Sequence, residues 1–270
     1  MRRPTTSRPT TEAVAASASN QARRPGLRWL AGLLYAALIV CLSWTAVFLA
    51  WGSLRAVDFG YPLLYELQGI DAHIARYAPA NRFRQGFEAS SREQRLALFA
   101  AINDAVHDGG RGLEALRYTD AQGRSVQFLR KPEIIHLRSV ARLLDQLGRV
   151  SWLMLGGLAL TLALLRAGRL PPPRSSRVLA WSAVVVLAAA GFVLAWGPEE
   201  VFNTLHAWVF PAGEQWFFYY EESLMTTLMK APDLFGGIAV LLLALAAVYF
   251  AALLLVCRAL LRRPLTPGRG

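Results

Sequence analysis

Four long apolar runs divide this sequence into alternating hydrophobic and polar parts. A helix that crosses a bilayer needs about 20 predominantly apolar residues, and each run is long enough, with essentially no charge in its interior. The first run exceeds the about 7–15 apolar residues of a signal-peptide core, and no clear small-x-small cleavage site follows it, so a signal peptide is disfavoured. The sequence predicts an all-α, polytopic membrane protein with four transmembrane helices, at about residues 29–51, 148–166, 178–196 and 234–257.

The basic residues flank the apolar runs on one side of the predicted membrane. Residues 1–28, 166–177 and 258–270 together hold 14 basic residues and 1 acidic residue, whereas the rest of the chain has 15 basic and 17 acidic residues. Lys and Arg near span ends mark the cytoplasmic face, so both termini are predicted inside, and segments 52–147 and 197–233 outside. The net charge of +11 therefore sets the topology and does not indicate a nucleic-acid partner.

The two cysteines both belong to predicted spans. Cys41 falls inside the first, and Cys257 lies at the cytoplasmic end of the last. The outer segments hold no cysteine, so no structural disulfide is expected there. A four-helix disulfide-generating enzyme, which needs cysteine pairs on the outer side, is excluded.

Composition separates a membrane domain from two tails. Residues 1–27 are rich in Arg, Thr, Ser and Ala without apolar periodicity, which predicts a disordered cytoplasmic tail. Residues 28–257 form the predicted four-span membrane domain, and 258–270 form a second cytoplasmic tail. The outer segment 52–147 is long enough to be a small, mainly helical domain between spans one and two.

Helical spacing recurs within the outer segment. It predicts helices over 62–78 and 90–107, the second one capped by Ser90 or Ser91. The sequence "DAQGR" at 120–124 predicts a turn between two short extended pieces.

Two further helices are predicted next to spans. One begins at Pro132 and continues without a break into the second span. The other begins at Pro198 after the third span, and "PAG" at 211–213 ends it. The aromatic run "WFFYY" that follows is typical of the headgroup layer.

All four histidines fall in the predicted outer segments. His136 and His206 each lie on a short helix beside a span, with a polar residue three positions earlier, Glu133 and Asn203 respectively. A carboxylate or amide at that spacing can fix the tautomer of an acid–base histidine, although spacing alone leaves a structural role open. Two histidines stand in polar, helix-like stretches and are expected to be structural, His73 and His107.

Motifs of several other catalytic classes are absent from the sequence. It contains no HExxH, no GxSxG and no Gly-rich phosphate loop. No two histidines have the i,i+4 spacing of zinc ligands on one helix, so neither a metal nor another cofactor is expected. The stretch "EEVFNTLH" (199–206) faintly resembles the EE and FxxxH motifs of CAAX-type membrane proteases, but these should lie on separate helices and lack here the expected arginine.

The two histidine blocks, in their order among four spans, resemble the bacterial family of lipoprotein intramolecular transacylases. The resemblance covers about residues 28–257. That family carries a Glu-x-x-His block before its second span, which "EIIHLRSV" matches at Glu133 and His136. It also carries a Phe-Asn-x-x-His block after the third span, followed by a Trp, which this chain matches at Phe202, Asn203, His206 and Trp216.

This resemblance implies an enzyme at the outer face of the bacterial cytoplasmic membrane. It would move the sn-2 acyl chain of a diacylglyceryl-modified lipoprotein to the amine of the N-terminal cysteine, leaving a lyso-form lipoprotein. Its partners would be the lipoprotein substrate and membrane lipid, with no nucleic acid and no cofactor. The implied site comprises catalytic His136 and His206, supporting Glu133, Ser139 and Asn203, and substrate or interface residues Trp216, Tyr219 and Tyr220. Ser139 and Ala141 stand where the family has Asp and Lys.

Elementary chemistry is compatible with this activity. An α-ammonium with a pKa near 8 must lose a proton before it attacks an ester, and imidazole is a suitable base. The leaving glyceryl oxygen needs a proton, and the oxyanion needs donors. Because the amine and the ester belong to one molecule, no protein nucleophile is required. We expect His136 and His206 to face each other across a cleft at membrane level, oriented by Glu133 and Asn203.

Two alternative functions remain open at this point. A non-catalytic accessory or sensor protein would use segment 52–147 to bind a partner, and its two histidines would lie far apart. A hydrolase of membrane lipid would use water as the nucleophile. The sequence also leaves open the oligomeric state and which histidine is the base.

Overall fold

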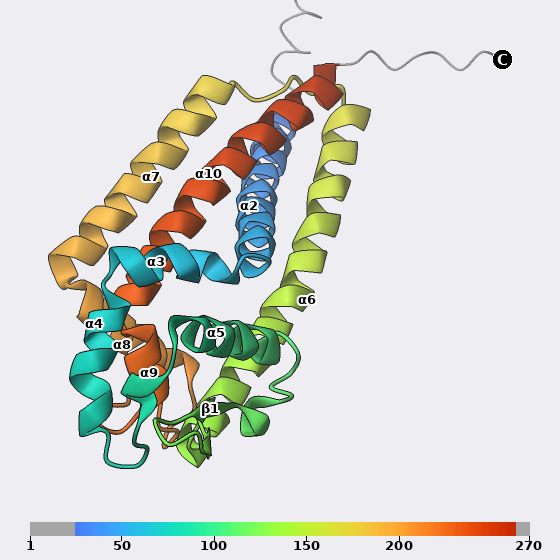
Figure 1. The fold of residues 1–270 in the computed structure, drawn as a ribbon. Helices are drawn as coiled ribbons and strands as arrows, with labels where there is room; N and C mark the ends of the chain where they lie inside the picture. Colours follow the sequence, from blue (N-terminus) through green and yellow to red (C-terminus); the bar gives the residue numbers. More distant parts are fainter. Residues whose placement is uncertain (1–24, 263–270) are drawn as a thin grey trace, which may run out of the picture.

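The computed structural model describes residues 25–262, with side chains from residue 29 onward. The predicted tails lie mostly outside the described residues, at 1–24 and 263–270. Four long helices form a bundle, and a folded domain sits at one end of it (Figure 1).

The four long helices match the four predicted spans. Each is long and apolar enough to cross a membrane, so the prediction of an all-α polytopic membrane protein is confirmed. Their bounds are α2 Pro25–Arg55, α6 Lys131–Ala167, α7 Ser175–Trp196 and α10 Asp233–Arg262.

The helix α2 is the centre of the bundle and packs along both α6 and α10. The shared core contains Leu38, Leu42 and Ala46 of α2, Leu158 and Leu165 of α6, and Phe250 and Leu254 of α10. The helix α7 packs more loosely, and within the described part of the chain Val178 is its one buried residue. An apolar helix with an exposed circumference is typical of a span that faces lipid.

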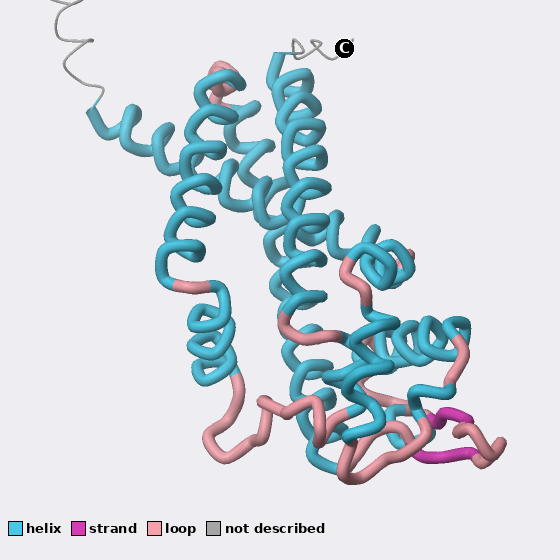
Figure 2. The backbone as a smooth tube through the Cα atoms, turned by 60° about the vertical axis from the view of Figure 1, so that its left-hand side comes forward, coloured by secondary structure: helices cyan, strands magenta, loops and turns pink. Residues whose placement is uncertain are grey.

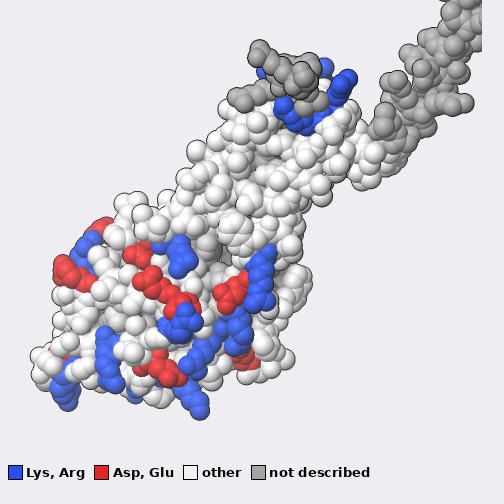
Figure 3. Space-filling model, turned by 90° about the vertical axis from the view of Figure 1, so that its right-hand side faces the viewer, with Lys and Arg blue, Asp and Glu red and all other residues white. Residues whose placement is uncertain are grey.

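Charged side chains on the face drawn in Figure 3 gather at the two ends of the molecule and leave an uncharged band between them. At the end away from the folded domain the charges are basic. The last turns of α6 and α10 hold Arg166 and Arg262. The uncharged band fits the hydrocarbon layer of a bilayer.

The folded domain, here called the head domain, consists of residues 56–130, the first turns of α6 and residues 197–232 (Figures 1 and 2). It is helical apart from one small hairpin. Its elements are η1 Asp58–Gly60, α3 Tyr61–Leu67, α4 Ile70–Tyr77, η2 Ala78–Ala80, η3 Phe87–Ala89, α5 Arg92–Val106, η4 Leu113–Ala115, β1 Arg117–Thr119, β2 Ser125–Gln127, α8 Pro198–Val209 and α9 Leu224–Met229.

The helix predicted over 62–78 is two helices in the structure, α3 and α4. Gly69 has a positive φ of 61°, which breaks the helical path at little steric cost. The prediction for α5 holds, because the Ser91 hydroxyl accepts a hydrogen bond of 3.2 Å from the amide of Gln94. The predicted turn at 120–124 joins β1 and β2, which pair antiparallel.

The two outer segments of the sequence share one core. Tyr61 of α3 stacks on Phe99 of α5, with ring centroids 3.9 Å apart. Leu224 and Leu228 of α9 are buried in the same cluster as Ile134 of α6. The segment after α7 is therefore an integral part of the head domain, which extends beyond the segment between the first two spans.

The two histidines that the sequence suggests as catalytic, His136 and His206, lie on helices α6 and α8. The helix α6 starts in the head domain and continues into the bundle without a break, as the sequence predicts (Figure 1). The short helix α8 follows α7 directly, and Gly197, with φ at 106°, permits the change of direction between them.

Candidate active site

His136 on α6 and His206 on α8 come together in the head domain. Their ring centroids are 6.4 Å apart, with 35° between the ring planes. Phe210 lies beside both rings, at 4.7 Å from His136 and 5.4 Å from His206. Two residues that are distant in the sequence thus form one pair, beside the start of the bundle.

His206 lies among aromatic rings that also belong to the α8 region. The Phe202 ring centroid is 3.8 Å from that of His206, and the Trp216 centroid is 5.1 Å away. These rings partly bury the imidazole, and burial lowers its pKa, although the bond to the Phe202 carbonyl acts in the opposite direction. A neutral imidazole that can accept a proton is therefore favoured at neutral pH.

The tautomer of His206 follows from a bond to the main chain. Its Nδ1 lies 2.8 Å from the carbonyl oxygen of Phe202, one helical turn earlier. A carbonyl oxygen only accepts, so Nδ1 donates and carries a proton. In the neutral ring the other nitrogen, Nε2, is then an acceptor, as a general base requires.

His136 has a carboxyl group for a neighbour. Oε1 of Glu214 lies 3.5 Å from Nδ1 of His136, and the two side chains are 9% and 10% exposed respectively. Within the described residues neither atom has a full hydrogen bond to another group. The carboxylate is therefore the nearest acceptor for a proton on Nδ1.

A short polar chain continues from Glu214 along α6. The Ser139 hydroxyl donates to Oε2 of Glu214 at 2.6 Å. The Arg142 guanidinium in turn donates to the Ser139 oxygen, also at 2.6 Å. Ser139 was predicted to support the site, and the structure connects it to His136 through Glu214.

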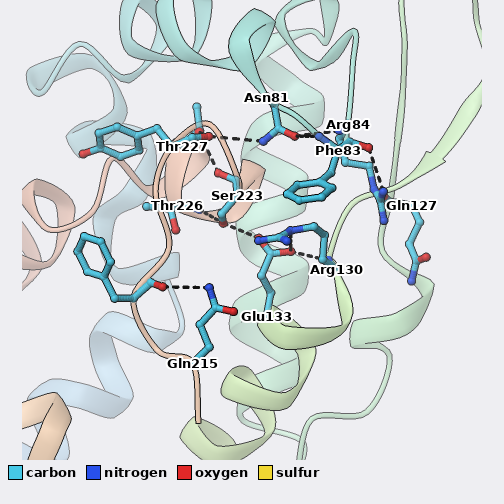
Figure 4. A network of polar contacts seen from close by, with 12 residues as sticks. Asn81, Phe83, Arg84, Gln127, Arg130, Glu133, Gln215, Ser223, Thr226 and Thr227 are labelled. Carbon is cyan, nitrogen blue, oxygen red and sulfur yellow. Dashed lines mark hydrogen bonds and ion pairs between the residues drawn. The ribbon is translucent and has the colours of Figure 1, made fainter. Parts of the chain in front are cut away.

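Glu133 has partners that differ from the predicted one. Its side chain is fully buried, and it accepts hydrogen bonds from the Ser223 hydroxyl and from the amide of Arg130 (Figure 4). The guanidinium of Arg130 lies 4.0 Å from the same carboxyl group. A buried carboxyl group requires such donors, so Glu133 connects the start of α6 to the start of α9. The carboxyl group that lies beside His136 is that of Glu214.

Asn203 was predicted to orient His206, but another group bonds to this imidazole. Within residues 29–262 no side-chain hydrogen bond of Asn203 is found, and the Phe202 carbonyl holds Nδ1 of His206. Because a helix places carbonyl oxygens along its axis, the main chain is the nearer acceptor.

The three predicted substrate or interface residues take different places. Trp216 lies against His206, as given above, and Tyr219 is 62% exposed at the surface of the head domain. The Tyr220 hydroxyl donates to the carbonyl of Ala231 at 2.6 Å, and its ring packs on His73. Tyr220 is therefore half-buried and packs within the head domain, away from the histidine pair.

The other two histidines lie outside this pair. His107 accepts a hydrogen bond of 3.0 Å from the Trp51 indole, and its second nitrogen lies 2.8 Å from the carbonyl of Asn103. His73 is 8% exposed and packs against Tyr77, with ring centroids 4.6 Å apart. These contacts agree with the structural roles expected for both.

Two residues of the site were missed in the sequence. Glu214 follows "PAG" in a loop, where no regular spacing relates it to His136. Phe210 is one aromatic residue among many in its segment. Their only local signal is an acidic residue surrounded by aromatic ones.

Comparison with known proteins gives a structural match and no match by sequence. No family model and no curated protein matches the chain. Among solved structures, the chain is similar to the membrane-integral lipoprotein intramolecular transacylase Lit from Bacillus cereus, solved as a variant with one histidine-to-arginine substitution. The TM-score is 0.52 at 13% sequence identity, over 88% of this chain and 95% of that chain. The chain thus shares the fold of this membrane-integral protein along nearly its whole length.

Proposed function

We propose that this chain is a membrane-integral intramolecular acyltransferase that acts on lipoproteins. It moves the sn-2 acyl chain of a diacylglyceryl-modified lipoprotein to the amine of the N-terminal cysteine and leaves a lyso-form lipoprotein. The observation that carries the proposal is the pair His136 and His206, with ring centroids 6.4 Å apart in the head domain. Its occurrence on a fold shared with a lipoprotein transacylase supports the same conclusion.

The histidine pair is suited to the proton transfers of this reaction. One imidazole accepts a proton from the cysteine amine, and the amine nitrogen attacks the carbonyl carbon of the ester. The ester C–O bond then breaks, and the second imidazole donates a proton to the sn-2 oxygen of the glyceryl group. An amide forms, an ester is lost, and no covalent intermediate with the protein is needed.

The aromatic surroundings favour transfer over hydrolysis. Phe202, Phe210 and Trp216 lie against the pair and limit the access of water, which would otherwise compete with the amine. Because the amine and the ester are tethered in one substrate, their proximity supplies much of the rate. A non-catalytic accessory protein offers no reason for two partly buried histidines to meet.

We assign the location from the sequence and the fold together. The basic end of the bundle is assigned to the cytoplasm, so the head domain faces outward from the bacterial cytoplasmic membrane. A lipoprotein anchored by its acyl chains presents its N-terminal cysteine at that level.

The test uses bacteria that lack any lyso-form lipoprotein of their own. We expect the wild-type chain to convert the N-terminal lipopeptide of a reporter lipoprotein to the N-acyl, monoacylglyceryl form, detected by fragmentation in mass spectrometry. His136→Ala and His206→Ala should each abolish the conversion, since acid–base groups contribute about 10²–10⁴-fold. His107→Gln, outside the pair, is the control and should remain active. Full activity in either alanine variant would contradict the proposal.

A further inference from the structure

Glu214 is a buried carboxyl group that the loop between α8 and α9 places against His136. Its side chain is 9% exposed, and Oε1 lies 3.5 Å from Nδ1 of the imidazole. Oε2 accepts a hydrogen bond of 2.6 Å from the Ser139 hydroxyl. A carboxylate that is removed from water needs such partners, so the loop holds this side chain in a defined place.

Few ionisable groups face His136 from the elements packed against it. From the loop it is Glu214, and from α8 it is His206, with ring centroids 6.4 Å apart. On α6 itself, Arg142 is directed to Ser139. The other neighbouring rings carry no charge, namely Phe210 and Phe218.

We infer that Glu214 is the positioning residue of His136, because its carboxylate keeps a proton on Nδ1 and so leaves Nε2 as the nitrogen that exchanges protons with the substrate. Glu214 itself touches no reacting atom. The inference rests on the proposed function, within which it also distinguishes the two histidines.

The two imidazoles have different acceptors on Nδ1. That of His206 is the neutral carbonyl of Phe202, and that of His136 is the carboxylate of Glu214. A carboxylate stabilises an imidazolium more than a neutral carbonyl does. Burial lowers the pKa of both imidazoles, but at His136 the hydrogen bond and the charge of Glu214 oppose this effect, whereas at His206 only a neutral carbonyl does. Of the two, His136 is therefore the one that Glu214 equips to act as the general acid, and His206 is the general base.

The proton balance closes with these roles. From the free amine, His206 takes one proton from nitrogen, and protonated His136 gives one to the leaving glyceryl oxygen. The pair then holds a protonated His206 and a neutral His136. One proton shift between them restores the starting state, and substrate and product contain the same atoms.

Ser139 and Arg142 orient the carboxylate. The Ser139 hydroxyl accepts from the Arg142 guanidinium at 2.6 Å and donates to Glu214 at 2.6 Å. Loss of the Ser139 hydroxyl leaves Oε2 of Glu214 without this donor, but the negative charge of Glu214 remains. Ser139→Ala should therefore have a smaller effect than Glu214→Gln.

The first test needs no substrate. Protein with ¹⁵N-labelled imidazole rings in lipid nanodiscs contains four histidines, and His136→Gln assigns the signals of His136. At a pH where the His136 ring is neutral, we expect its proton to lie on Nδ1 in the wild type and to shift toward the other tautomer in Glu214→Gln, while His206 is unchanged. Unchanged His136 signals in Glu214→Gln would overturn the inference.

The second test measures transfer with the same variants. Glu214→Gln should lower kcat by at least about tenfold, less than the about 10²–10⁴-fold loss of a group that transfers the proton itself, with little change in KM. Glu214→Asp, which keeps the charge, should recover part of the rate. Glu222→Gln is the matched control, because this carboxyl group of the same loop pairs with Arg82 at 3.5 Å and should behave as wild type.

The two tests separate this inference from the proposed function. If His136→Ala and His206→Ala retain full transfer activity, the proposed function fails, whatever the NMR signals show. If both alanine variants are inactive while Glu214→Gln has wild-type kcat, Glu214 has no positioning role and only the inference fails.

Discussion

The proton on His206 is fixed by the helix that carries the residue, because Nδ1 bonds to the Phe202 carbonyl one turn earlier. Burial lowers the pKa of this imidazole below its ordinary value of 6.5. The neutral form, which is the proposed base, is then the major form at every pH above that lowered pKa.

We therefore predict that kcat at saturating substrate falls with acidification only below pH 6.5. The substrate amine has a pKa near 8 and should instead appear in kcat/KM, which rises up to about that pH. The measurement is a pH series in nanodiscs. An acidic limb of kcat centred above pH 6.5 would contradict a neutral, partly buried base.

Burial also lowers the pKa of His73, and this shift makes the stability of the fold depend on pH. Burial and the nearby Lys230 lower the pKa of His73 to about 4, whereas the residue titrates near 6.5 when it is exposed. The unfolded chain thus binds a proton that the folded chain rejects. The stabilisation is complete above pH 6.5 and is lost as pH falls toward 4.

We predict that His73→Phe, which keeps a ring beside Tyr77 and Tyr220, weakens this dependence. The thermal midpoint of the wild type should drop between pH 6.5 and pH 4 by more than that of the variant. Equal drops in both proteins would show that His73 is not the group responsible.

At the scale of elements, the first turn of α6 is connected to α9. The Ser223 hydroxyl donates to Glu133 and also accepts from the amide of Thr226 at 2.9 Å, which caps α9. The buried carboxyl group of Glu133 thereby links α6, the helix of His136, to α9, which follows the loop that carries Glu214 (Figure 4).

Glu133→Ala should therefore destabilise the head domain without changing the tautomer of His136. The buried Ser223 hydroxyl and the partly buried Arg130 amide lose their acceptor. An unsatisfied buried donor costs about 1–3 kcal/mol, so we expect a clearly lower thermal midpoint. The ¹⁵N signals of His136 should stay as in the wild type, in contrast to those of Glu214→Gln. A shifted tautomer in Glu133→Ala would restore the orienting role that the sequence suggested.

Regular elements were predictable because their signals are local. Apolar runs predicted the four spans, and the stretch from Pro132 was correctly expected to be one helix continuous with the second span. The short helix α9 was missed, because its six residues show no period of their own and are stabilised by burial in the head domain.

At the scale of the whole molecule, the head domain and the basic end of the bundle lie on opposite sides of the uncharged band (Figure 3). The sequence could place the two histidines on one side of the membrane, but their approach depends on how two separate outer segments share a core. The contact between Glu214 and His136 likewise depends on tertiary structure, because the conformation of the loop between α8 and α9 places Glu214 there. Spacing along one helix suggested Glu133 and Asn203 as partners, yet tertiary contacts engage Glu133 elsewhere.

The orientation gives a prediction for intact cells. Ser125, exposed in the hairpin, and Ser176, exposed in the first turn of α7, lie on opposite sides of the membrane in this account. Ser125→Cys should react with a membrane-impermeant thiol reagent in intact spheroplasts, and Ser176→Cys only after permeabilisation. The native cysteines are buried, so wild-type chain is the background control. The reverse pattern would invert the assigned topology.

The most direct measurement of the central claim uses purified protein in nanodiscs and an equimolar mixture of unlabelled and acyl-deuterated diacylglyceryl lipopeptide. Intramolecular transfer by the histidine pair predicts a product of unchanged mass, in which fragmentation locates one acyl chain on the cysteine amine. No label should cross between molecules, and His136→Ala and His206→Ala should give no product. A product lighter by one fatty acid would indicate hydrolysis, and either this result or full conversion by an alanine variant would contradict the account.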